Sequence, residues 1–64
     1  MQGTTTSLFN DQTGISVEVV TIAGGFAVNV KLPDEPKYIV FRRYAERERA
    51  METAREVVMG SQKV

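Results

Sequence analysis

Apolar and polar residues alternate along the first half of the chain, as they do in half-buried β-strands. Residues 15–22 are rich in β-branched side chains and begin with a strict alternation. Residues 26–32 alternate throughout and place four apolar side chains on one face: Phe26, Val28, Val30 and Leu32. Because Gly24 and Gly25 lie between the two segments and accept positive φ values, we predict a β-hairpin with a two-residue turn.

A turn made of Gly24 and Gly25 would fix the pairing of the two strands. It places Val19 opposite Val30 and Val17 opposite Leu32, so that the strongly apolar residues share one face. On the other face it places Glu18 directly opposite Lys31.

Two further strands are expected, one on each side of this hairpin. Residues 4–10 precede a turn in which Gly14 takes a positive φ. Residues 37–42 follow the turn Pro33-Asp-Glu-Pro36, whose prolines cannot donate to a strand ladder. This last strand would add Ile39 opposite Val30 and Phe41 opposite Val28 to the apolar face.

The period of the pattern becomes helical from about Tyr44 to Met59. One apolar stripe is formed by Ala50, Met51, Ala54, Val57 and Val58. No Ser, Thr, Asp or Asn caps the start, whereas Gly60 is suited to the position after the last turn. We therefore predict an α+β fold, in which a small antiparallel meander of three to four strands carries one C-terminal amphipathic helix on one face. We expect residues 1–64 to be one domain, with loose ends at 1–3 and 61–64.

Composition narrows the chemistry that the chain can carry out. The 64 residues contain no His and no Cys, which removes the commonest general base, thiolate nucleophiles and disulfides. We accordingly expect no enzymatic activity, no cofactor, no metal site and no small-molecule substrate. The lack of disulfides, of a signal peptide and of a membrane span favours a cytoplasmic location.

The balance of eight basic and eight acidic residues is the sum of two unlike halves. Residues 1–30 hold only two acids, whereas residues 31–64 hold all eight basic residues and six acids. At this size, apolar burial contributes about 90 kcal/mol, and ordering the chain costs about the same. The monomer should therefore be marginal, which favours a homodimer or a protein partner.

Charged residues of the second half suggest two features. Glu48, Glu52 and Glu56 follow one line of the predicted helix, where we expect a solvated face with Arg49 and Arg55 compensating Glu52. A partner-binding stripe is the alternative there. The only basic cluster, with interleaved tyrosine, comprises Arg42, Arg43, Tyr44, Arg47 and Arg49, and such a cluster could bind nucleic acid weakly.

The sheet face turned away from the helix is predicted to be apolar, since one helix covers only one face. Its expected residues form a candidate partner interface: Val20, Ile22, Ala27, Asn29, Tyr38 and Val40. The leading hypothesis is a small non-enzymatic protein-binding module that acts by surface occlusion or scaffolding. Phage- and plasmid-encoded modulators of host machinery, including inhibitors of defence systems, are often of this size and kind. The alternative hypothesis is a nucleic-acid-binding module that uses the Arg/Tyr cluster.

Overall fold

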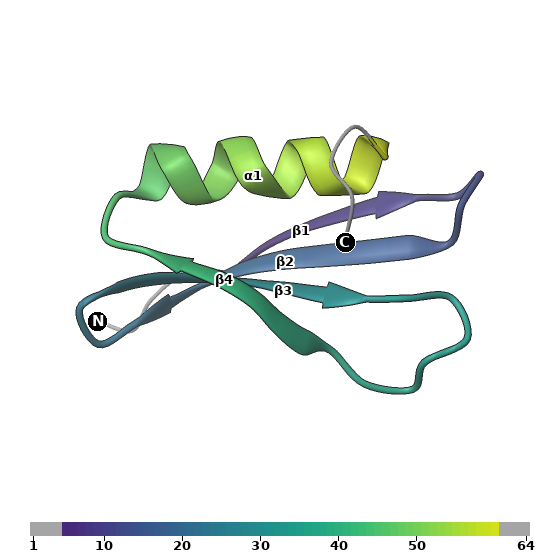
Figure 1. Ribbon diagram of the computed structural model, residues 1–64, viewed down its shortest axis with the longest axis horizontal. Coiled ribbons are helices and arrows are strands. Elements are labelled where there is room, and N and C mark those ends of the chain that lie inside the picture. The colour runs from purple at the N-terminus through teal and green to yellow at the C-terminus, as the bar shows by residue number, and fades with distance from the viewer. Residues whose placement is uncertain (1–4, 61–64) are drawn as a thin grey trace.

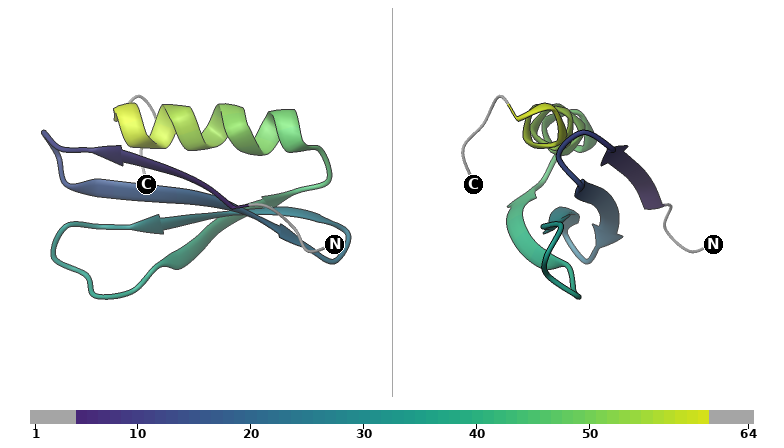
Figure 2. Two further views of the ribbon diagram at one scale, coloured as in Figure 1. Left: turned by 180° about the vertical axis from the view of Figure 1, so that it is seen from behind. Right: turned by 90° about the vertical axis from the view of Figure 1, so that its right-hand side faces the viewer.

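The computed structural model describes residues 5–60, which form four β-strands followed by one α-helix (Figure 1). The elements are β1 (Thr5–Asn10), β2 (Ile15–Ile22), β3 (Gly25–Lys31), β4 (Ile39–Tyr44) and α1 (Arg47–Met59). The strands form one antiparallel sheet in the order β1-β2-β3-β4, and α1 covers one of its faces (Figure 2). This confirms the predicted α+β meander with a C-terminal helix. The ends expected to be loose, residues 1–3 and 61–64, lie outside the described residues.

The β2–β3 hairpin pairs in a register two residues away from the predicted one. Ile22 pairs with Gly25, so the turn is formed by Ala23 and Gly24 instead of Gly24 and Gly25. Gly24 has a φ of 85°. The shift is an even number of residues, so every side chain keeps the face that the alternation predicted.

Close packing explains the position of Gly25. A Cβ atom at Gly25 would overlap the carbonyl oxygen of Tyr44 and would lie 3.1 Å from Cα of Ala45. Gly25 is therefore required where the connection between β4 and α1 crosses the end of β3. As a result, Val17 pairs with Val30, and the predicted pairing with Leu32 is wrong.

A bulge changes the expected pairing of β3 with β4. Val30 pairs with Ile39 as predicted, but Val28 pairs with Arg42, because the register shifts between Val28 and Asn29. The extra residue is Phe41, which still packs against the core. The guanidinium carbon of Arg42 lies 5.4 Å from the centroid of the Phe41 ring.

Asn10 joins the β1–β2 turn to the helix. Its side-chain oxygen accepts the backbone N–H of Gln12 at 2.9 Å, and its carbonyl accepts that of Gly14 at 2.7 Å. Gly14 has the positive φ that was predicted, 80°. The amide nitrogen of Asn10 also donates to the carbonyl oxygen of Val58 at 2.8 Å. This bond fixes the C-terminal end of α1 over the end of β1.

Helix α1 begins at Arg47, later than predicted, because the residue before it, Glu46, is extended and makes no side-chain cap. Its end is as predicted, since Gly60 takes a left-handed φ of 81° and its N–H bonds the carbonyl of Val57. The buried stripe contains Thr53, which the apolar pattern did not include. Its hydroxyl donates to the Tyr44 hydroxyl at 2.7 Å, which satisfies a buried polar group.

The core between α1 and the sheet is made of small side chains. Its fully buried members include Val17, Val28, Val30 and Val57, together with Ala50 and Ala54. Alanines on the helix allow α1 to approach the sheet closely. Several larger apolar side chains of the chain remain at the surface.

The helix crosses the sheet diagonally. It follows the end of β4, where Thr53 bonds Tyr44, and it ends over the last residue of β1, where Val58 bonds Asn10. In an antiparallel meander of four strands these two strand ends lie at opposite ends of the sheet. The start of β4 and the start of β1 are therefore the two corners that α1 leaves uncovered. Consequently Ile39, predicted for the core face, is 55% exposed.

Candidate protein-binding surface

The sheet face opposite α1, called the outer face below, carries two rows of side chains across all four strands. Directly paired residues of antiparallel strands share a face, so the rows follow from the register. The first row is Thr5, Val20, Ala27 and Arg43, and the second is Ser7, Glu18, Asn29 and Val40. No described residue forms a second layer over these rows (Figure 2).

The structure brings together four of the six residues predicted for the partner interface. Val20, Ala27, Asn29 and Val40 are neighbours in the two rows. Ile22 lies at the end of β2, beside the turn. Tyr38 precedes β4 and lies outside the ladder. The sheet itself shields the centre of the face, so Ala27 is buried, Val20 and Asn29 are half-buried, and only Val40 is broadly exposed.

Exposed apolar area is concentrated at the start of β4. Tyr38, Ile39 and Val40 are 40%, 55% and 51% exposed. They are consecutive in the chain: Ile39 lies on the helix face, at the corner that the diagonal helix does not cover, and Val40 lies on the outer face. We call Tyr38–Val40 the β4 apolar segment. The sequence pattern assigned Ile39 to the core and therefore missed that the three residues form one exposed segment.

A hydrogen bond links the two polar residues in the middle of the outer face. The amide nitrogen of Asn29 donates to a carboxylate oxygen of Glu18 at 3.1 Å. The predicted pairing of Glu18 with Lys31 is wrong, because Lys31 lies opposite Ser16. The amide oxygen of Asn29 is buried and has no hydrogen-bond partner among the described residues. An unsatisfied buried acceptor costs about 1–3 kcal/mol, and such groups call for a specific explanation.

The structure separates the five residues of the Arg/Tyr cluster. Arg43 lies on the outer face opposite Ala27, whereas Arg42 lies at the bulge over the Phe41 ring. The hydroxyl of Tyr44 is bonded to Thr53, so its half-buried ring is part of the fold. Arg47 and Arg49 both extend from the exposed surface of α1. With no shared platform for bases and phosphates, the geometry gives the nucleic-acid alternative little support, and it stays a prediction.

Arg49 pairs with a residue other than the expected one. Arg49 lies 3.8 Å from the carboxylate of Glu46, whereas the sequence analysis assigned it to Glu52. Both side chains of this pair are mostly exposed, so it adds little stability. Glu48 and Glu52 are exposed, and Glu56 is half-buried.

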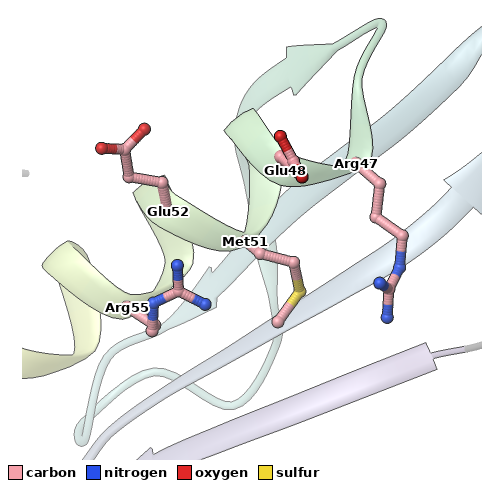
Figure 3. A pocket seen from close by; sticks show the side chains of 5 residues that line it. All are labelled: Arg47, Glu48, Met51, Glu52 and Arg55. Carbon is pink, nitrogen blue, oxygen red and sulfur yellow. The ribbon is translucent and has the colours of Figure 1, made fainter.

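A hollow of about 440 Å³ lies along one flank of α1 (Figure 3). Its lining consists of Arg47, Glu48, Met51, Glu52 and Arg55. Arg47, Met51 and Arg55 are four residues apart and therefore follow one side of the helix. Basic and acidic side chains are equally represented around the central methionine.

The described part of the chain shows no group of three or more His, Cys, Asp or Glu side chains placed to hold a metal ion. Within residues 5–60, no helix has the length and apolar character needed to cross a membrane.

Searches of protein-family models, curated proteins and solved structures find no match to this chain. The surfaces described above are therefore the basis for inferring its function.

Proposed function

We propose that the chain is a small non-enzymatic protein-binding module that acts by surface occlusion or scaffolding. The β4 apolar segment and the adjoining outer face would contact the partner. The observation that carries this proposal is the exposure of three consecutive large apolar side chains, Tyr38, Ile39 and Val40. Single exposed apolar residues are common on proteins, whereas contiguous ones are typical of interaction sites.

Burial of this segment would supply part of the binding energy. Complete burial of a large apolar side chain is worth about 1.5–3 kcal/mol. Because about half of each side chain is already covered, the segment would contribute roughly 3 kcal/mol in total. The remainder has to come from the surrounding polar residues.

Those polar residues define the chemistry of the partner. Lys37 precedes the segment, and Arg42 and Arg43 follow it, so that basic side chains flank the segment along the chain. An apolar core with a polar rim is the usual anatomy of a protein–protein interface. The matching partner would present an apolar surface bordered by carboxylates. A donor on that partner could also satisfy the unpaired amide oxygen of Asn29 after a small shift of the neighbouring side chains.

This mode of action needs no catalytic group in the chain. If the chain covers the functional surface of its partner, the partner is inhibited. If the chain holds its partner beside another protein, it acts as a scaffold. A modulator or inhibitor of a larger assembly is the form of this function that suits so small a chain. The absence of Cys suits a reducing compartment such as the cytoplasm.

The test is a comparison of two equally non-conservative surface variants in affinity purification from the native host. Val40→Lys places a charge in the β4 apolar segment, whereas Met59→Lys does so at an exposed apolar residue at the far end of α1. The natural chain and the Met59→Lys variant should recover the same protein, and the Val40→Lys variant should lose it. Circular dichroism should show that both variants fold.

Two results would contradict the proposal. The first is a protein recovered equally well by the Val40→Lys variant, which would place the interface elsewhere. The second is the recovery of no protein by the natural chain.

A further inference from the structure

The sheet has two edge strands, β1 and β4. The edge formed by β1 has none of the usual protection against pairing with a further strand. Proteins protect edge strands with charged residues, prolines and bulges. β1 has the sequence Thr-Thr-Ser-Leu-Phe-Asn, which contains no charge and no proline, and its pairing with β2 is regular. No described residue pairs with the outer edge of β1. Its backbone N–H and C=O groups on that side are available to another strand.

The other edge is protected. β4 carries the bulge at Phe41, the charged residues Arg42 and Arg43, and Pro36 shortly before its start. A continuous ladder along β4 would have to accommodate all of these. Pairing with a further strand is therefore more favourable at β1.

The hollow on α1 lies on the same side of the molecule as β1. Thr53 faces β4, since its hydroxyl bonds Tyr44. Successive residues of an α-helix are about 100° apart, so Met51 lies about 200° around the helix from Thr53. Figure 3 shows Arg47 and Met51 pointing from α1 toward the sheet. They lie on the flank of the helix opposite to the one that faces β4. A strand added to the edge of β1 would therefore lie beside this hollow.

Both features are self-complementary, as a two-fold interface requires. Any antiparallel pairing of β1 with a second β1 brings no like charges together, because the strand has none. The hollow has two arginines and two glutamates around one methionine. The flank is therefore neutral, and the flanks of two copies do not repel each other.

We propose that two copies of this chain associate through β1, with the two strands antiparallel and their four-stranded sheets joined into one. The axis passes at Ser7, so that Ser7 faces its own copy and Thr5 faces Phe9 of the second copy. This register uses the exposed Phe9 side chain and leaves Asn10 to its turn. The two α1 helices lie on the same face of the joined sheet.

This inference does not depend on the proposed function, because it leaves the β4 apolar segment free. A failure of the dimer would not remove the partner site on β4, and a failure of that site would not remove the dimer. The core of valines and alanines is thin, so the monomer gains from further protection. In the dimer the joined sheet shields the backbone of β1 from water.

Sedimentation of the natural chain, with no tag before β1, tests the association itself. We expect a monomer–dimer equilibrium that shifts to dimer as the concentration rises through the micromolar range. A chain that stays monomeric at high micromolar concentration would overturn the proposal.

Single cysteines test the location of the interface, because the natural chain has none. Ser7→Cys places a thiol at the proposed axis, and Arg43→Cys is its matched control, an exposed outer-face residue on the other edge strand. Under mild oxidation the Ser7→Cys protein should form a disulfide dimer at least about ten times faster than the control. Equal rates, or a faster reaction of the control, would show that β1 is not the interface.

Discussion

The two edge strands have the same length and contrasting chemistry. β1 is uncharged and regular and is joined to α1 by the side chain of Asn10. β4 is basic and bulged, and its end is joined to α1 by Tyr44 and packs closely on Gly25 of β3. The contrast shows how a sheet with one helix can offer two different surfaces. One edge can continue the sheet, while the other can present side chains only.

The largest expected effect is at the contact between the start of β3 and the connection from β4 to α1. Gly25→Ala adds a methyl group where the carbonyl of Tyr44 and Cα of Ala45 already lie. We expect it to lower the free energy of unfolding by about 3 kcal/mol, as overpacking against backbone does. Urea denaturation measures this value.

Gly24→Ala is the matched control for this substitution. Gly24 also has a positive φ, but nothing lies within 4 Å of the added atom. Its cost should be limited to backbone strain of about 1 kcal/mol. A Gly24→Ala variant as unstable as Gly25→Ala would mean that packing at the β4–α1 connection is not the cause.

The anchor of β1 should have a smaller effect. Asn10→Ala removes the bond to Val58 and the bond from Gln12, and we expect a loss of about 2 kcal/mol. Asn10→Asp keeps the acceptor for Gln12 but places a negative charge beside the carbonyl end of α1, so it should be no more stable than Asn10→Ala. Denaturation of the two variants decides this point. An Asn10→Asp variant with natural stability would show that the bond to Val58 contributes nothing.

Sequence reasoning predicted which face each residue of β2 and β3 takes, and it failed where packing decided. The alternation of Val17, Val19, Val28 and Val30 is local and survives an even register shift. Gly25 was predicted to lie in the turn, because the local pattern gave no other reason for a glycine there. The residue that requires this glycine is Tyr44, which is far along the chain.

The candidate site was predicted only in part for the same reason. Val20, Ala27, Asn29 and Val40 follow from the alternation, and they do lie together on the outer face. The exposure of Ile39 depends on the diagonal path of α1. That path is fixed by bonds between residues far apart in the chain, such as Asn10 to Val58. The bulge at Phe41 likewise has no signal in the alternation.

The smallest effect concerns the charges beside β1. Arg55→Glu leaves the flank of α1 with three glutamates and one arginine, so that two negatively charged flanks would lie on the same face of the joined sheet. We expect the dissociation constant of the dimer to rise about tenfold, which is about 1.4 kcal/mol. Adding Glu48→Arg to the same chain should restore the affinity, because the flank is then neutral again. Sedimentation equilibrium of both variants measures the change, and an Arg55→Glu dimer of natural affinity would place the helices differently.

Hydrogen–deuterium exchange of the natural chain at low and at high micromolar concentration tests the contrast between the two edges most directly. The amides of residues 5–9 should exchange more slowly as the concentration rises, because a second β1 then pairs with them. The amides of residues 39–44 should exchange at the same rate in both samples. Protection that rises in β4 while β1 is unchanged, or that rises in neither strand, would contradict the account.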